Sequence, residues 1–231
     1  MKITEKYGLR DITTLHLDVK CDYFVEYEAI SELRSLLLGE LKGKRIMQIG
    51  GGSNLVFSGD FHGYILHSLM RGIKVVKEAD KHVWLEVESG HGWDDFVRYC
   101  VDHGYWGAEN MSYIPGECGA SAVQNVGSYG AEAKDIIESV NCISTDDATE
   151  RTFSNAECRF GYRYSAFKDE LKGKYIVTSV VYRLSKEPRL NLSYGALQHL
   201  EPSQLTLQGI REAIIAIRTS KLPDWHKIGS V

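Results

Sequence analysis

The chain has 231 residues, of which 43% are hydrophobic and 25% charged, a composition typical of a globular protein. The formal net charge of -4 excludes a broadly basic surface of the kind that holds nucleic acid through its phosphates. No apolar stretch approaches the roughly 20 residues that span a bilayer, and the N-terminus lacks the apolar segment of a secretory signal. We therefore expect a cytoplasmic protein with no nucleic-acid partner and no membrane partner.

The cysteines show no pattern that indicates a metal site or a disulfide framework. There are five of them, namely Cys21, Cys100, Cys118, Cys142 and Cys158. They are an odd number, they are widely separated, and no two of them form a CxxC pair. This spacing predicts reduced, structural thiols and no bound metal. Cys118 lies in a glycine-rich segment and is the candidate for a special role.

The first predicted elements form a strand, a helix and a second strand that ends in a glycine loop. Residues 23–27 are typical of a short strand, and residues 29–38 repeat apolar side chains at helical spacing. A compact apolar run at 45–49 predicts the second strand. It leads directly into the run GGGSN at 50–54, a loop that few side chains could occupy.

Further along the chain, alternating polar and apolar residues predict more strands with two helices among them. The expected strands are 64–67, 73–76, 83–87, 140–143 and 175–184. The first three suggest a meander. The expected helices are 93–102, which Gly104 would end, and an amphipathic helix over 207–218. These elements predict an α+β chain with two lobes.

The glycine loop at 50–55 is the first candidate binding site. Consecutive glycines let backbone N–H groups point into one concavity and approach a phosphate without a side-chain clash. The run is not the GxGxxG dinucleotide fingerprint, and it lacks the lysine of a phosphate-binding P-loop. A tight turn without a ligand is the alternative explanation.

A second candidate is the long segment at 107–130, GAENMSYIPGECGASAVQNVGSYG. Long irregular segments in compact domains are uncommon and usually functional, and this one is too apolar for disorder. Its small residues would let backbone groups pair with a flat polar heterocycle, while Gln124 and Asn125 add directed donors and acceptors. The alternative is a buried structural loop.

The third candidate is the segment ECRFGYRYSAFK at 157–168, in which cationic side chains alternate with aromatic ones. Arginine offers a rigid fork of donors that suits a carboxylate or an enolate better than the ammonium group of lysine. The segment therefore suits the recognition of an anion. A solvated basic loop is the alternative.

Together these three segments resemble the UDP-N-acetylenolpyruvoylglucosamine reductase family, in which similar segments occur in the same order and at similar spacing. Two further runs agree with that family. One is LSYGAL at 192–197, and the other is RTSKLP at 218–223, which is similar to the family's R-x-x-K-L-P. The resemblance covers essentially the whole chain.

The resemblance implies an α+β, bilobal FAD-binding fold of the vanillyl-alcohol-oxidase or PCMH type, with non-covalent FAD between the lobes. We expect the first FAD-binding lobe at 1–70, the second at 71–218, and the start of a substrate domain at 219–231. The residues expected around FAD are Gly50, Gly51, Gly52, Ser53, Asn54, Leu55, Ser112, Ile114, Pro115, Gly116, Gly119, Ala120, Gln124, Asn125, Gly127, Tyr129 and Gly130.

The reaction implied by the resemblance is the reduction of an enolpyruvyl UDP-sugar to UDP-N-acetylmuramate, with NADPH as the hydride donor and FAD as the carrier. Tyr162 and Arg163 match the family's active-site pair, in which the arginine stabilises an enolate-like intermediate. Tyr194 matches a tyrosine that contacts the nucleotide part of the substrate. We expect a monomer whose partners are the UDP-sugar and NADPH.

The sequence departs from the family after the R-x-x-K-L-P run. The family's proton-donating serine lies in a GSFFKNP-like segment at that point, and a glutamate near the far C-terminus assists it. Neither is present, and Ser230 aligns better with the residues before that segment. We therefore expect a C-terminally truncated chain that lacks the substrate domain, binds FAD and is catalytically incomplete.

Two other interpretations remain open. The first is a non-catalytic flavin-binding module, against which Tyr162 and Arg163 argue because mere retention of FAD needs no cation beside a substrate. The second is an alcohol oxidase of the same fold whose flavin is attached covalently to a histidine. The histidines available for such a link are His62, His67, His91 and His103.

Overall fold

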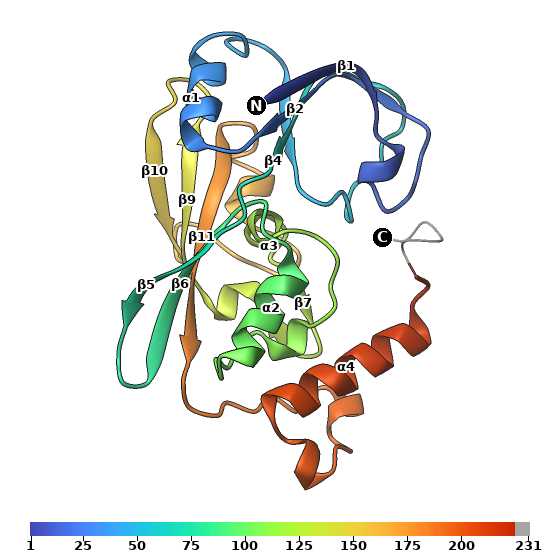
Figure 1. Cartoon of the computed structure of the whole chain (residues 1–231), viewed down its shortest axis with the longest axis vertical. Coiled ribbons are helices and arrows are strands. Elements are labelled where there is room, and N and C mark those ends of the chain that lie inside the picture. The colour runs from blue at the N-terminus through green and yellow to red at the C-terminus, as the bar shows by residue number, and fades with distance from the viewer. Residues whose placement is uncertain (225–231) are drawn as a thin grey trace.

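Two β-sheets form the framework of the protein, and the computed structural model describes residues 1–224 of it (Figure 1). Sheet A contains β1 (Lys2–Gly8), β2 (Lys20–Tyr27), β3 (Ile46–Ile49) and β4 (Phe61–Ser68). Sheet B contains β5 (Ile73–Glu78), β6 (His82–Glu88), β9 (Ile137–Ser144), β10 (Glu150–Ser154) and β11 (Tyr175–Ser185). The strand orders are β1-β2-β4-β3 and β10-β9-β11-β6-β5.

Sheet A is mixed, and its parallel part is the predicted unit of two strands and a helix. Helix α1 (Ile30–Leu38) follows β2, and both β2 and β3 pair with β4 in parallel. The helix buries Leu33, Leu36 and Leu37 against the sheet, because leucines at this spacing lie on one face. β1, which the sequence analysis did not predict, is an antiparallel edge strand with mostly polar residues.

The expected meander is wrong for its first strand, because β4 belongs to sheet A whereas β5 and β6 belong to sheet B. In sheet A, Ile65 pairs with Phe24 on one side and with Met47 on the other. Tyr64, Ile65 and Leu66 are buried in succession, as in a central strand with both faces covered. The apolar pattern predicted a strand correctly, but it carried no information about the strand's partners.

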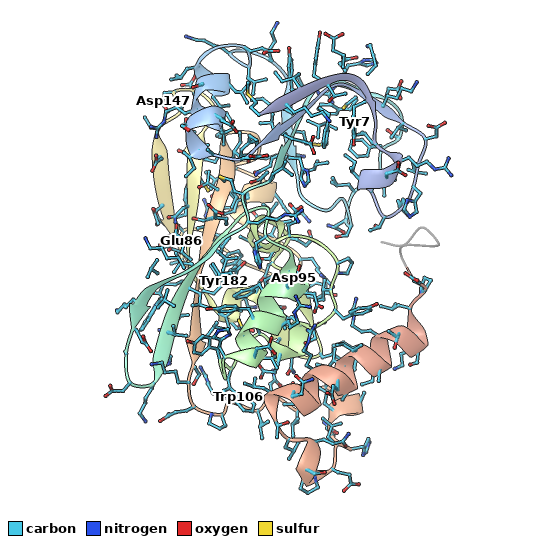
Figure 2. All side chains as sticks on the ribbon, viewed as in Figure 1. Tyr7, Glu86, Asp95, Trp106, Asp147 and Tyr182 are labelled. Atoms are coloured by element: carbon cyan, nitrogen blue, oxygen red, sulfur yellow. The ribbon has the colours of Figure 1, made fainter. Side chains whose placement is uncertain are left out.

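Sheet B is antiparallel, and two helices pack against one of its faces (Figure 1). They are α2 (Trp93–Asp102) and α3 (Cys118–Gln124). The contact is aromatic, since the rings of Phe96 and Tyr182 stack with their centroids 4.4 Å apart. Figure 2 shows Tyr182 between sheet B and α2. This core positions α3, which becomes one wall of the cleft described below.

The segment at 107–130 is more regular than the sequence predicted. It contains α3 and the strand β7 (Gly127–Ser128), which pairs with β8 (Ala131–Glu132). α3 escaped prediction because it is short and contains a glycine, which disfavours a helix. Gly119 serves close packing, since a Cβ on it would lie 2.7 Å from the Cβ of Ser89.

Short 3-10 helices complete the described chain. They are η1 (Arg10–Ile12), η2 (Glu109–Met111), η3 (Ala133–Asp135), η4 (Ala166–Lys168), η5 (Gly195–Leu197) and η6 (Pro202–Gln204). They lie in the connections between strands and helices and end without extending into α-helix. η2 leads directly to the run SYIPGE, which approaches the glycine loop.

The last described helix, α4 (Leu207–Lys221), begins at a side-chain cap and packs on the lower end of the α2 layer. The Thr206 hydroxyl accepts the Gly209 N–H at 3.0 Å. Ile210 and Ile214 are buried beside Trp106, as the predicted amphipathic face requires. No helix within residues 1–224 is long and apolar enough to cross a membrane. Ser230 lies outside the described residues.

One side chain joins the two sheets. Gln48 in β3 donates from Nε2 to the Val177 carbonyl at 2.9 Å, and its Oε1 accepts the Val177 N–H at 2.9 Å. β6 pairs with β11 only from Ser179 onward, so at Val177 no strand pairs with β11 on the side where β6 would lie. The Gln48 amide supplies the hydrogen bonds that a neighbouring strand would otherwise make.

We predict that Gln48→Leu destabilises the fold by about 1–3 kcal/mol, because it leaves the N–H and C=O of the buried Val177 without partners. Urea unfolding measures the change. Gln208→Leu is the matched control, because Gln208 is exposed on α4 and, within residues 1–224, its side chain bonds only to Glu212; the variant should stay within about 0.5 kcal/mol of the parent. Equal shifts in the two variants would contradict the role of Gln48.

The cysteines are free and buried, in agreement with the predicted structural thiols. Burial raises the pKa of Cys21 to about 11 and that of Cys158 to about 12. Burial also raises the pKa of Cys100, Cys118 and Cys142. Cys118, the candidate for a special role, is fully buried, so the fold makes it an inert thiol rather than a nucleophile.

We therefore predict that the native protein reacts very slowly with a disulfide reagent such as Ellman's reagent at pH 8. The same protein in guanidinium chloride should titrate all five thiols quickly, which serves as the control. Rapid reaction of a thiol in the native protein would show that its burial is transient.

Candidate functional site

A cleft of about 610 Å³ opens between the end of sheet A and the α3 side of sheet B. Its size lies in the range of about 300–1,000 Å³ that is usual for small-molecule sites. Many residues predicted from the sequence line it, namely Gly50, Gly51, Gly52, Ser53, Asn54, Leu55, Gly116, Gly119, Ala120 and Gln124. Two segments that lie far apart in the chain thus meet at one cleft.

The glycine loop needs its glycines for both turning and close approach. Gly52 has φ 61°, and a Cβ there would lie 2.1 Å from the Ile12 carbonyl oxygen. A Cβ on Gly51 would lie 3.3 Å from the Cα of Gly116. The Ser53 hydroxyl donates to the Pro115 carbonyl at 3.1 Å, which ties the loop to the opposite segment. The loop therefore presents backbone rather than side chains to the cleft, as a phosphate-binding loop does.

Cationic side chains gather at the same cleft. Arg45, Lys168 and Lys172 line it, and the Arg45 guanidinium lies 4.5 Å from the centre of the Phe61 ring. Lys168 was expected from the basic segment at 157–168, whereas Arg45 and Lys172 belong to no motif and were not expected. Positive side chains that share a cleft with a glycine loop favour the binding of an anionic ligand there.

One carboxylate also lines the cleft. Glu117 precedes α3, is 9% exposed, and bonds through Oε1 to Nε2 of His67 at 2.9 Å. The contact with the imidazole replaces part of the solvation that the carboxylate loses on burial. The contact also joins β4 of sheet A to the start of α3.

Tyr162 and Arg163 occupy the tip of a tight turn. Gly161 and Tyr164 exchange backbone hydrogen bonds of 3.0 and 3.1 Å, and Arg163 has φ 54°. Both tip side chains are exposed, Tyr162 by 83%. The arginine and the tyrosine are therefore accessible to a ligand that approaches from solvent.

The base of this turn is fastened to the C-terminal end of α3. The Asn125 amide donates to the Gly161 carbonyl at 2.7 Å, and the Ser165 hydroxyl donates to the Val123 carbonyl at 2.7 Å. Lys168 Nζ donates to Gln124 Oε1 at 2.8 Å and to the Arg163 carbonyl at 3.1 Å. The turn is thus held beside the cleft.

Several residues expected to contact FAD instead make hydrogen bonds or apolar contacts within the protein. The Asn125 side chain is buried, and its oxygen accepts the Lys134 N–H at 3.0 Å. The Ser112 hydroxyl is buried and donates to the Glu109 carbonyl at 2.6 Å. Ile114 packs against the sheet B core. Neither these three residues nor Pro115 is among the described residues that line the cleft.

The remaining expected residues lie together outside that lining. The rings of Tyr129 and Tyr194 meet edge to face with their centroids 5.0 Å apart. Gly130 has φ 82°, and a Cβ on it would lie 2.4 Å from the Ser193 hydroxyl. Gly127 belongs to the β7–β8 hairpin. The structure therefore joins the end of the 107–130 segment to the segment that carries Tyr194.

None of the described residues that line the cleft is a histidine. His62 is exposed beside Asp22, and the His103 ring stacks on Tyr99. His67 bonds to Glu117 as described above, and burial lowers the pKa of His91. These positions offer no histidine in the cleft for a covalent flavin link.

Comparison with known proteins identifies the class of this cleft. The family described as "FAD binding domain" matches residues 22–153. The fold also resembles the crystal structure of a UDP-N-acetylenolpyruvylglucosamine reductase from Thermus caldophilus. Its TM-score is 0.71 at 20% identity, covering 96% of this chain and 70% of that one. A solvent-stable cholesterol oxidase shares the fold at TM-score 0.59 and 10% identity over 78% of this chain and 38% of that one. The protein thus has an FAD-binding α+β fold of the PCMH type.

Sequence relatives define the family more narrowly. The UDP-N-acetylenolpyruvoylglucosamine reductase of Flavobacterium johnsoniae is 40% identical over 235 residues, which cover 100% of this chain and 69% of that protein. The Bacteroides fragilis enzyme of the same name is 43% identical over 228 residues, which cover 98% of this chain and 68% of that protein. The chain belongs to the UDP-N-acetylenolpyruvoylglucosamine reductase family.

The residues of the cleft fit FAD. The glycine loop brings backbone close to the cleft, because a side chain has no room at Gly52 and little room at Gly51, and this suits the diphosphate. The cleft also has an apolar part, with Ile46, Val123 and Ile176 in its lining, which suits flat aromatic rings. The cleft therefore combines what the two chemically different parts of FAD require.

We predict that Gly52→Ala prevents the protein from retaining FAD and destabilises it by roughly 1–3 kcal/mol, because the left-handed backbone and the Ile12 carbonyl leave no room for a methyl group. Desalting followed by an absorbance spectrum measures retention. Gly59→Ala is the control, since a Cβ there meets nothing within 4 Å and should leave retention unchanged. Retention of FAD by Gly52→Ala would contradict the geometry.

Proposed function

We propose that this protein serves the NADPH-dependent reduction of UDP-N-acetylglucosamine enolpyruvate to UDP-N-acetylmuramate, a precursor of peptidoglycan. The observation that carries the proposal is the fastening of the Tyr162–Arg163 turn to the helix that lines the FAD cleft. A module that only retained FAD would have no need for a cation held beside the cleft. The family membership supports the same reaction.

We infer a separate task for each part of the site. The glycine loop holds the diphosphate of non-covalent FAD through backbone N–H groups, with Lys168 and Lys172 as counter-charges. FAD, when bound, supplies the hydride chemistry. Arg163 stabilises the negative charge that develops beside the substrate carboxylate, and Tyr162 lies next to it on the same turn. Tyr194 contacts the nucleotide part of the UDP-sugar.

The proposal extends to the organisation of the chain. We infer FAD-binding lobes at 1–70 and 71–218, because the strands of sheet A precede residue 70 and those of sheet B follow it. The chain functions as a monomer in the cytoplasm, where NADPH and UDP-sugars occur. The 231-residue polypeptide binds FAD but does not complete turnover, since the family's GSFFKNP-like segment is absent from its sequence.

An absorbance spectrum of the purified chain with FAD, taken before and after desalting and again after denaturation, tests the cofactor. We expect flavin bands that survive desalting and leave the protein on denaturation. Flavin that stays attached after denaturation would support a covalent oxidase, and flavin lost on desalting would reject tight binding by this chain.

Anaerobic mixing with NADPH and then with the UDP-sugar tests the reaction. We expect no sustained turnover by this polypeptide. Turnover at the rate of a full-length relative would contradict its incompleteness. Arg163→Met supplies a second readout, because it should weaken binding of the anionic substrate while FAD retention stays unchanged.

A further inference from the structure

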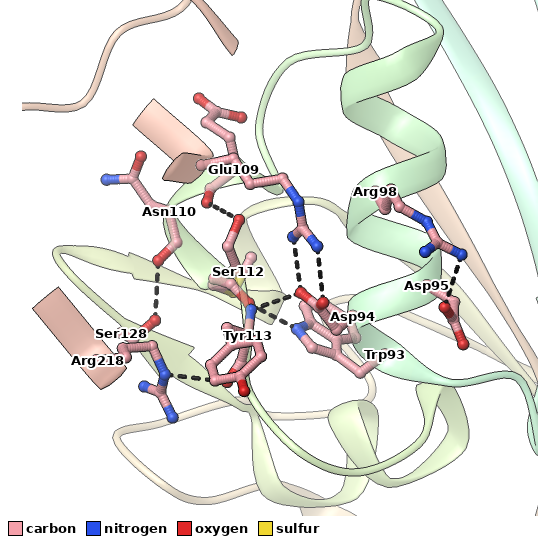
Figure 3. A network of polar contacts seen from close by, with 12 residues as sticks. Trp93, Asp94, Asp95, Arg98, Glu109, Asn110, Ser112, Tyr113, Ser128 and Arg218 are labelled. Carbon is pink, nitrogen blue, oxygen red and sulfur yellow. Dashed lines mark hydrogen bonds and ion pairs between the residues drawn. The ribbon is translucent and has the colours of Figure 1, made fainter. Parts of the chain in front are cut away.

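Asp94, the second residue of α2, joins three separate segments through one carboxylate (Figure 3). Its two oxygens accept hydrogen bonds from Nη1 and Nη2 of Arg211 in α4, each at 2.7 Å. Oδ1 also accepts the backbone N–H of Tyr113. Paired parallel hydrogen bonds between a guanidinium and a carboxylate set orientation as well as distance. The contact therefore fixes α4 relative to both α2 and the Tyr113 backbone.

Tyr113 has a backbone conformation that needs external support. Its φ is 61°, in the left-handed region that a bulky residue rarely adopts. Asp94 holds its N–H, and Nε of Arg218 in α4 donates to its carbonyl at 3.0 Å (Figure 3). The backbone N–H and the backbone carbonyl of this one residue are thus both bonded by charged side chains. Strained residues persist where the surroundings over-determine them, and they concentrate at ligand sites.

The residues that follow Tyr113 form the wall opposite the glycine loop. The Pro115 carbonyl accepts the Ser53 hydroxyl, and the Gly116 carbonyl accepts the Trp93 N–H at 3.0 Å. The glycine loop passes so close that a Cβ on Gly51 would lie 3.3 Å from the Cα of Gly116. The turn at Tyr113 therefore sets where this wall stands.

The pair between Asp94 and Arg211 is also partly withdrawn from solvent, with side-chain exposures of 32% and 10%. Burial alone would raise the pKa of Asp94, but hydrogen bonds from Arg211 and the Tyr113 N–H outweigh it and lower the pKa. The carboxylate is consequently charged at neutral pH. Removing its charge would leave a buried guanidinium without its partner.

We propose that Asp94, Arg211 and Arg218 are positioning residues for the FAD cleft, here called the α4 clamp. The clamp fixes the left-handed turn at Tyr113 and thereby holds residues 114–116 against the glycine loop. FAD affinity consequently depends on the docking of α4, although no clamp residue lines the cleft. This inference rests on the proposed binding of FAD in that cleft.

The test measures the FAD dissociation constant of Asp94→Asn and Arg211→Lys by quenching of flavin fluorescence. Asparagine removes the charge, and lysine keeps the charge but loses the paired geometry. Because hydrogen bonds to charged groups are strong, we expect about tenfold weaker binding in each variant. We also expect an altered visible circular dichroism spectrum of the bound flavin, which reports on the displaced wall.

Asp95→Asn is the matched control. Asp95 adjoins Asp94 on α2, but its ion pair with Arg98 is exposed, with side-chain exposures of 63% for Arg98 and 61% for Asp95 (Figure 3). Exposed pairs contribute little, so its dissociation constant should stay within about twofold of the parent. Urea unfolding of each apoprotein separates a loss of stability from a loss of affinity.

Arg218→Lys removes the hydrogen bond to the Tyr113 carbonyl and leaves the Asp94–Arg211 pair intact, so it tests the clamp if Asp94→Asn fails to fold. Asp94 and Arg218 both act through Tyr113. The double variant Asp94→Asn/Arg218→Lys should therefore raise the FAD dissociation constant by less than the product of the two single fold-changes. Stable clamp variants that bind FAD like the parent, with an unchanged flavin spectrum, would overturn the clamp. A parent protein that binds no FAD would instead reject the cofactor site, and the clamp with it.

Discussion

The hydrogen bonds between the Gln48 side chain and the Val177 backbone decide where the two sheets meet. Gln48 and Val177 both line the cleft, so the contact that joins the sheets also sets the separation of its walls. The glycine loop starts directly after β3, and its direction follows from the position of that strand. The pair between His67 and Glu117 repeats the arrangement, since it ties β4 of sheet A to the start of α3.

The wall contributed by α3 and the segment before it is supported from outside the cleft. The Tyr162–Arg163 turn is bonded to one end of α3, and α4 is bonded to the Tyr113 turn before its other end. A site built on such supports is pre-organised, because it is already ordered before the ligand binds and loses little conformational entropy on binding. This arrangement explains why residues such as Asn125 serve the site through internal hydrogen bonds.

Local sequence patterns predicted what depends on local geometry. Periodic leucines and isoleucines identified α1 and α4, and a glycine run identified a loop without side chains. Three ordered segments also identified the family, because such segments encode backbone shapes specific to one cofactor fold. Of the 17 residues expected around FAD, ten line the cleft, because the glycine loop and α3 are backbone features that a local run of small residues marks. Helical periodicity failed for α3, where a glycine needed for packing beside Ser89 obscured the pattern.

The sequence by itself therefore determined most of the strands, the three longer helices, the family, and the glycine loop and the 107–130 segment as candidate binding segments. Only the tertiary structure decided that β4 lies between β2 and β3, that Arg45 and Lys172 line the same cleft as the glycine loop, and that Arg211 meets Asp94 across 117 positions of chain. Hydrophobic periodicity reports which face of an element is buried and not which element covers it. Contacts between distant side chains arise from packing, and no local pattern encodes them.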